Sequence, residues 1–281
     1  MISATDTTVT SHGGLELPKI GLGTYSLNGT KGAQAIAKAI DAGYRLIDSA
    51  FNYENEGAVG KAVWSSSVPR EDLIIATKLP GRHHAYDKAT VTIEESLYRT
   101  GLDYIDLYLI HWPLPRIDKY VEAWQALIDA QSRGLVRWIG VSNFLPDHLE
   151  RLQQETGILP QVNQIQLSPY FPDVDMVDYN TRRGIITEAW SPLGRGRDLL
   201  ADPVIVAIAA AHDATPAQIV LAWHMSRGVV PIPKSATFER QVHNLAAVNI
   251  TLTGVEIQRI NALARPDGRV LDLDPATHEE F

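Results

Sequence analysis

The sequence contains no cysteine among its 281 residues. This absence excludes disulfide bonds, thiolate metal ligands and a cysteine nucleophile, and we expect a cytoplasmic protein. No apolar run approaches the roughly 20 residues that a membrane-spanning helix needs. The opening segment MISATDTTVTSHGG lacks the basic and apolar regions of a secretory signal. We therefore expect no membrane partner.

Positive charge is also in short supply, because 25 lysines and arginines face 33 aspartates and glutamates, for a formal net charge of -8. This balance argues against a nucleic-acid partner, since the overall field repels polyanions. Any anionic ligand must be held by local positive charge. The chain has no HExxH motif, and His83 and His84 are neighbours in a predicted loop, so we expect no metal site.

No low-complexity segment or flexible linker divides the chain, which indicates a single domain over residues 1–281. Eight apolar, β-rich runs alternate with stretches of helical period. These runs are residues 20–24, 45–50, 73–79, 104–111, 136–143, 162–168, 185–191 and 229–234. Glycines at the expected left-handed caps end several predicted helices, namely Gly43, Gly101, Gly134 and Gly157. This alternation predicts an α/β fold, a (β/α)8 TIM barrel.

Three additions to the barrel are expected. A short β-hairpin, residues 7–10 and 15–18, comes first, turning at His12-Gly13-Gly14. An extra helix at 203–212 follows strand seven, and a last one at 253–264 packs outside the barrel. The tail at 265–281 is either a loop over the substrate mouth or a frayed end. The rival architecture, an open doubly wound sheet, is disfavoured because GLGTYS and GRGRDLL both lack the third glycine of the dinucleotide fingerprint.

Polar residues stand where three successive strands end. Asp48 ends one strand, Lys78 comes just before the Pro80-Gly81 break after the next, and His111 ends the third, while Tyr53 lies in the turn after Asp48. In a closed barrel this end carries the chemistry. Reduction of a carbonyl needs a proton donor aimed at the oxygen, and a tyrosine serves if a cation lowers its pKa from about 10. Lys78 is the candidate cation, Asp48 its partner, and His111 would orient the carbonyl; the alternative for each residue alone is a structural ion pair or a half-buried loop position.

A second group of residues favours a nicotinamide cofactor. Ser142, Asn143 and Gln164 offer hydrogen bonds for a carboxamide, and Trp190 offers a ring to stack on, although each taken singly is more often structural. After strand eight, a predicted helix start carries cations and polar groups, a pattern typical of a phosphate site. Its residues are Lys234, Ser235, Arg240, His243 and Asn244. Lys234 with Arg240 favours NADPH over NADH; the alternative is that both are solvated surface charges.

The motifs GLGTY, RLIDSAFNYENEGAVGKAV, GLDYIDLYLIHWP, IGVSNF, VNQIQLSPY, WSPLGRG and IPKSATFERQVHN, in this order, resemble the aldo-keto reductase family. The similarity is to its bacterial branch of 2,5-diketo-D-gluconic acid reductases. The resemblance implies that Tyr53 is the general acid, tuned by Lys78 and Asp48, and that His111 orients the carbonyl. It also implies NADPH contacts from Gly23, Thr24, Tyr25, Asp48, Ser142, Asn143, Gln164, Trp190, Ser191, Leu193, Gly194, Lys234, Ser235, Thr237, Arg240, His243 and Asn244. The family usually has Glu or Gln where this chain has His243.

The resemblance further implies substrate contacts from Tyr25, Phe51, Asn52, Tyr53, His111 and Trp112. We therefore expect a monomeric, NADPH-dependent reductase of small aldehydes, ketones or dicarbonyls, such as 2,5-diketo-D-gluconate or methylglyoxal. A non-catalytic NADP(H)-binding sensor on the same fold is the alternative. A metal-assisted barrel hydrolase is a third hypothesis, which the missing ligand set disfavours.

Overall fold

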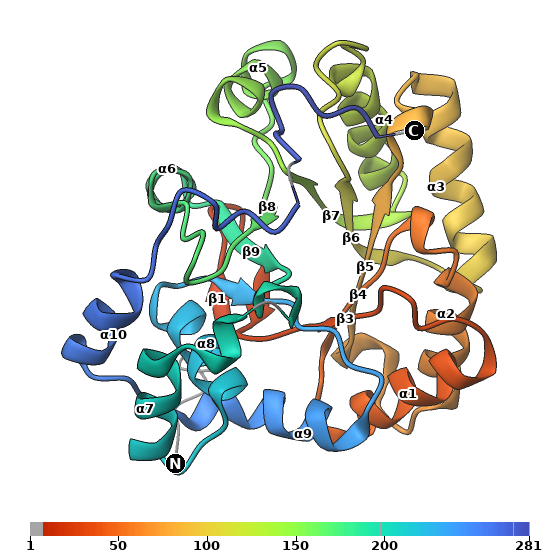
Figure 1. Ribbon diagram of the computed structural model, residues 1–281. Helices are drawn as coiled ribbons and strands as arrows, with labels where there is room; N and C mark the ends of the chain where they lie inside the picture. The colour runs from red at the N-terminus through yellow and green to blue at the C-terminus, as the bar shows by residue number, and fades with distance from the viewer. Residues whose placement is uncertain (1–7, 197, 272, 281) are drawn as a thin grey trace.

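Eight parallel strands form one sheet in the computed structural model, which describes residues 8–196, 198–271 and 273–280. Neighbours in the sheet follow chain order: β3 (Leu22–Gly23), β4 (Leu46–Asp48), β5 (Ile74–Leu79), β6 (Ile105–Ile110), β7 (Val136–Ser142), β8 (Val162–Gln166), β9 (Ile186–Trp190) and β10 (Val230–Pro231). The two edges meet where Gly23 forms a parallel bridge with Lys234 and donates its N–H to Pro233 O at 3.0 Å. The sheet therefore closes into the predicted barrel (Figure 1).

Helices lie outside the strands (Figure 1). They are α1 (Gly29–Ala42), α2 (Glu56–Ser65), α3 (Tyr86–Thr100), α4 (Tyr120–Ser132), α5 (Pro146–Thr156), α6 (Val174–Arg182), α7 (Pro203–Ala211), α8 (Pro216–Ser226), α9 (Phe238–Ala246) and α10 (Gly254–Asn261). Gly101 and Gly157 cap α3 and α5 with left-handed φ angles of 67° and 75°, as predicted. Helices α1 to α6 each bury one face against the outward side chains of the strands, which forms the largest apolar core.

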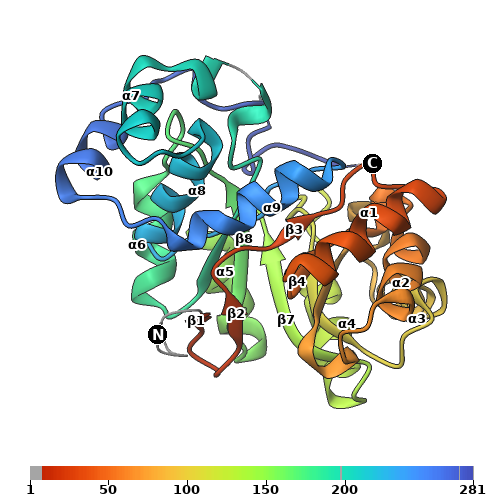
Figure 2. The same ribbon diagram turned by 90° about the horizontal axis from the view of Figure 1, so that it is seen from below.

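The predicted hairpin is β1 (Thr8–Thr10) paired with β2 (Glu16–Pro18); Thr7, also predicted in it, lies outside the described residues. Leu15 and Leu17 are buried among the inward side chains of the barrel strands. Hydrogen bonds from Ser11 Oγ to Gln161 Oε1 (2.6 Å) and from His12 N to Gly184 O (2.7 Å) attach the hairpin just before β8 and β9 begin. The hairpin thus closes the amino-terminal end of the barrel (Figure 2).

The predicted extra helices are α7 and α10. Ile260 of α10 packs with Ile205 and Ile208 of α7 in a separate apolar cluster, away from the strands (Figure 1). Within the described ranges, no single helix is long and apolar enough to cross a membrane. By length and composition alone, α7 and α8 pass that test as a pair bent by 90°.

The first and last barrel strands are shorter than the predicted 20–24 and 229–234. The reason is the proline content of the closing edge, since Pro231 and Pro233 have no N–H to donate to a ladder. Their carbonyls still accept from Gly21 N and Gly23 N at 3.0 Å each. Closure therefore depends on carbonyls of one edge and amides of the other.

Candidate active site

The carboxyl ends of the strands surround a cavity of about 800 Å³. Asp48 is the last residue of β4, Lys78 is the fifth residue of β5, and His111 follows β6 directly. Tyr53 ends the short 3-10 helix η2 (Phe51–Tyr53) that follows β4. The structure therefore brings the four predicted catalytic residues to one end of the barrel.

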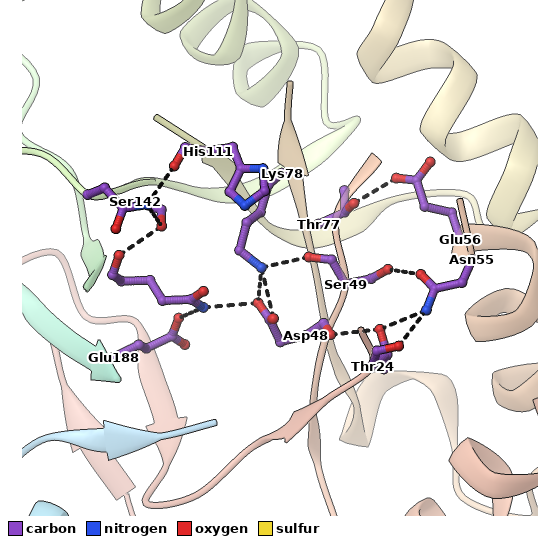
Figure 3. Close-up of polar contacts among 12 residues, drawn as sticks. Thr24, Asp48, Ser49, Asn55, Glu56, Thr77, Lys78, His111, Ser142 and Glu188 are labelled. Atoms are coloured by element: carbon purple, nitrogen blue, oxygen red, sulfur yellow. Dashed lines mark hydrogen bonds and ion pairs between the residues drawn. The ribbon is translucent and has the colours of Figure 1, made fainter. Parts of the chain in front are cut away.

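Lys78 and Asp48 form a buried ion pair beneath the cavity. Lys78 Nζ donates to Asp48 Oδ1 at 2.6 Å, to Asp48 Oδ2 at 2.8 Å and to Ser49 O at 2.7 Å (Figure 3). Burial, the largest single influence, would lower the pKa of Lys78, but the attractions of Asp48, Tyr53 and Glu188 together exceed it, and the pKa is raised. The ammonium therefore stays charged, although its side chain is fully buried.

Tyr53 lies beside this cation, with Lys78 Nζ 5.3 Å from the centre of its ring. Burial raises the pKa of the Tyr53 phenol, Lys78 opposes this, and Asp48 and Glu280 add to it, so the pKa lies above its usual value. Lys78 thus acts in the predicted direction, but burial outweighs it. The phenol keeps its proton at neutral pH.

The segment that carries Tyr53 is held by a buried hydrogen-bond network that the sequence did not reveal. Asn55 accepts from Ser49 Oγ at 2.7 Å and donates to Thr24 O at 2.7 Å, while Thr24 Oγ1 donates to Asp48 O at 2.9 Å (Figure 3). These bonds tie the ends of β3 and β4 to the turn. Thr24, predicted as a cofactor contact, is buried in this network and does not line the cavity.

A second hidden group, Glu188, extends the polar core. Gln164 Nε2 donates to Asp48 Oδ1 at 3.0 Å and to Glu188 Oε2 at 2.7 Å (Figure 3). Burial, with repulsion from Asp48, raises the pKa of Glu188 to about 8. Gln164 and Glu188 face each other in the β8–β9 register. Glu188 also stands two residues before Trp190, so strand alternation could have placed it on the inner face.

The predicted carboxamide contacts are bonded to one another. Ser142 Oγ donates to Gln164 O at 2.8 Å, and Asn143 Nδ2 donates to Ser142 Oγ and His111 O at 3.0 Å each. Asn143 takes a left-handed φ of 63°, which asparagine tolerates better than most residues. Its Oδ1 accepts from Trp190 Nε1 at 2.8 Å, which fixes the edge of that ring.

The cavity continues from the catalytic end to cations that follow β10, as a dinucleotide requires. Lys234 and Arg240 both line it, and α9 begins beside them. Ser235 Oγ accepts from Thr237 N at 3.1 Å and so organises the turn before α9. A hydrogen-bonding and aromatic end, an intervening space and a cationic end together fit an NADPH molecule.

Most predicted site residues line this cavity: Gly23, Tyr25, Asp48, Asn52, Tyr53, His111, Trp112, Ser142, Asn143, Gln164, Trp190, Ser191, Leu193, Lys234 and Arg240. The others lie behind or beside the lining: Thr24, Phe51, Lys78, Gly194, Ser235, Thr237, His243 and Asn244. Phe51 faces a separate hollow, with the Arg99 guanidinium 3.9 Å from its ring centre. Phe51, predicted as a substrate contact, therefore lies outside the lining of the main cavity. Across the described ranges, no three His, Asp or Glu side chains converge as a metal site would require.

The tail after α10 crosses the mouth of the barrel, and is the loop rather than the frayed end (Figure 1). The His278 ring lies 4.4 Å from Trp112, and Glu279 accepts from Arg116 N at 2.9 Å. Glu280 Oε1 lies 2.7 Å from His111 Nδ1. No periodic pattern in the tail indicated that Glu280 would lie beside His111. The contact depends on the path of the tail in the folded chain.

The chain is similar in sequence and in structure to known proteins of one family. The model described as "Aldo/keto reductase family" matches residues 19–265. The chain is 47% identical to 2,5-diketo-D-gluconic acid reductase B of a Corynebacterium species, over 98% of each chain. It is 42% identical to methylglyoxal reductase DkgA of Escherichia coli, over 97% of this chain and 98% of that one. The chain also matches a crystal structure of a Gox0644 mutant in complex with NADPH, with 39% sequence identity and a TM-score of 0.92. The match covers 97% of this chain and 98% of that one.

Proposed function

Because the chain belongs to the aldo/keto reductase family, as its motifs predicted, we propose that it reduces small aldehydes, ketones or dicarbonyls to alcohols. It is an NADPH-dependent oxidoreductase, as its reductase relatives and NADPH-bound structural neighbours indicate. The observation that carries the proposal is the Lys78–Asp48 ion pair beneath Tyr53, in a cavity that also reaches Trp190.

NADPH, when bound, supplies the hydride to the carbonyl carbon. In our proposal, Tyr53 donates the proton to the carbonyl oxygen, because its phenol is protonated and faces the cavity. Lys78 favours the phenolate that remains, and Asp48 keeps Lys78 in place and charged. His111 hydrogen-bonds the carbonyl oxygen and orients it. The buried surroundings strengthen each of these interactions.

We propose that Ser142, Asn143 and Gln164 bind the nicotinamide carboxamide and that Trp190 stacks on its ring. The support is that all four line one wall and hold one another by hydrogen bonds. Stacking needs a fixed plane, and the bond from Trp190 Nε1 to Asn143 provides one.

The remaining cofactor contacts are proposed along the same cavity. Ser191 and Leu193 would follow the pyrophosphate, and Lys234 with Arg240 would bind the adenosine 2'-phosphate. Two cations at one end favour NADPH over NADH, because the phosphate carries charge that NADH lacks. The walls around the substrate would come from Tyr25, Asn52 and Trp112, which line the cavity together with Tyr53 and His111.

The proposed setting is that of a monomer in the cytoplasm. The chain has no cysteine that would require an oxidising compartment. Sedimentation of the purified protein with and without NADPH measures its mass, and a dimer in both states would contradict the monomer.

The function is tested by following NADPH absorbance with methylglyoxal, 2,5-diketo-D-gluconate, simple aldehydes and keto esters in one assay. We expect steady NADPH oxidation with at least one small aldehyde or dicarbonyl. Tight NADPH binding without oxidation by any of these carbonyls would instead favour the non-catalytic sensor.

A further inference from the structure

A carboxylate from the tail stands inside the substrate end of the cavity. Glu280 Oε1 accepts from Asn52 Nδ2 at 2.7 Å and lies 2.7 Å from His111 Nδ1, while Oε2 accepts from Gly81 N at 2.9 Å. Its side chain is 13% exposed. Two of these partners, Asn52 and His111, are groups that we propose to contact substrate.

The approach of the tail is built into the barrel rim. A Cβ added to Gly81 would stand 2.8 Å from Glu280 O and 2.5 Å from the Leu114 side chain, so only glycine fits there. Glu279 is held by Arg116 N, outside the lining of the cavity. The position of Glu280 therefore depends on matched groups on both sides.

This carboxylate is charged at neutral pH. Burial alone would raise the pKa of Glu280, but His111, Gly81 N and Asn52 outweigh it and lower the pKa to about 2. A fixed negative charge thus shares the cavity with Tyr53 and Trp112. The cations Arg195, Lys234 and Arg240 line the same cavity. Lys234 and Arg240 are proposed to bind the cofactor, and Arg195 Nε donates to Ser191 Oγ at 3.0 Å.

We propose that Glu280 is a specificity-determining residue, which disfavours carbonyl substrates that carry a carboxylate and favours neutral ones. A substrate carboxylate bound near His111 would be repelled by the Glu280 carboxylate, because little solvent screens the two charges. It would also compete with Glu280 for the Asn52 and His111 side chains. At separations of about 6–8 Å and an effective dielectric constant of about 20, the repulsion corresponds to roughly 30- to 100-fold in binding. The inference rests on the proposed function. Within it, methylglyoxal is favoured over 2,5-diketo-D-gluconate, whose carboxylate is ionised.

The experiment compares kcat/KM for 4-nitrobenzaldehyde and 4-carboxybenzaldehyde, which share a ring and differ in charge. In Glu280→Gln the ratio of the anionic to the neutral value should rise at least about tenfold over the wild-type ratio. Glu279→Gln, the matched control on the same tail, should leave the ratio within about twofold. Glu280→Asp keeps the charge and should also stay near the wild-type ratio.

An unchanged or lower ratio in Glu280→Gln overturns the proposal. An equal rise in Glu280→Asp or Glu279→Gln also overturns it, because the effect would then come from a loosened tail and not from charge. If the wild-type protein reduces neither these aldehydes nor any carbonyl of the panel above, the proposed function fails by itself. The ratio is then taken from dissociation constants of the two aldehydes, measured by tryptophan fluorescence of the NADPH complex, with the same outcomes.

Discussion

Replacing Lys78 by methionine removes a cation but leaves its carboxylate partner buried. The attraction across the 2.6 Å between Lys78 Nζ and Asp48 Oδ1 is about 6 kcal/mol at an effective dielectric constant of about 20. Gln164 Nε2, 3.0 Å from Asp48 Oδ1, compensates part of this loss. We therefore expect Lys78→Met to lower the free energy of unfolding by about 3–5 kcal/mol, the usual result of leaving a buried charge unpaired.

The double variant separates charge pairing from lost packing. In Asp48→Asn with Lys78→Met no unpaired charge remains, so its loss of unfolding free energy should be smaller than the sum of the two single losses by about 2–3 kcal/mol or more. Urea denaturation, followed by tryptophan fluorescence, measures all four proteins. Additive losses within about 0.5 kcal/mol, or a loss below about 1 kcal/mol for Lys78→Met, would refute the assignment of a strongly coupled pair.

Three other perturbations address the acid, the cofactor and the hidden carboxyl. Tyr53→Phe should keep the dissociation constant for NADPH, measured by fluorescence titration, and lose about 10²- to 10⁴-fold in kcat; near wild-type turnover would remove Tyr53 from the role of acid. Lys234→Met with Arg240→Met should raise the KM for NADPH at least about tenfold and change that for NADH by less than about threefold, and an equal rise for both would contradict a 2'-phosphate site. The folded-state pKa of Glu188, about 8, is raised above its ordinary value of 4.5, so its protonated form stabilises the fold at low pH and this contribution is lost as pH rises through 8. Between pH 6 and pH 8 the unfolding free energy should fall by about 2 kcal/mol more in the wild type than in Glu188→Gln, and parallel pH profiles in urea denaturation would contradict the buried, protonated acid.

Sequence patterns were sufficient for the parts of the site that stand at the ends of apolar runs. Asp48, Lys78 and His111 each stand at or next to the end of such a run, and eight runs alternating with helical segments leave few architectures besides the barrel. Candidate catalytic residues at the strand ends can therefore be predicted from the sequence, since an apolar run gives way to a polar residue at the point where the strand ends.

The groups that sequence reasoning missed are defined by contacts between distant segments. Glu188 is a charged residue inside an apolar strand, and its meaning appears only when Gln164 and Asp48 lie beside it. Glu280 comes from a tail without periodicity, more than 160 residues after His111 along the chain. The upward pKa of Tyr53 was hidden for the same reason, because burial depends on everything that packs around the ring.

Among the described residues, the hairpin with its buried Leu15 and Leu17 fills the amino-terminal end of the barrel, and the cavity lies at the carboxyl end. A ligand that enters the cavity from the carboxyl end would pass the rim where Glu280 accepts from Gly81 N. Two ligands that reach their sites through one opening would bind and leave in a fixed order. The ligand that lies deeper in the cavity would bind first and dissociate last. A hairpin that fills the amino-terminal end of the barrel would thereby set the order in which ligands bind and leave at the carboxyl end.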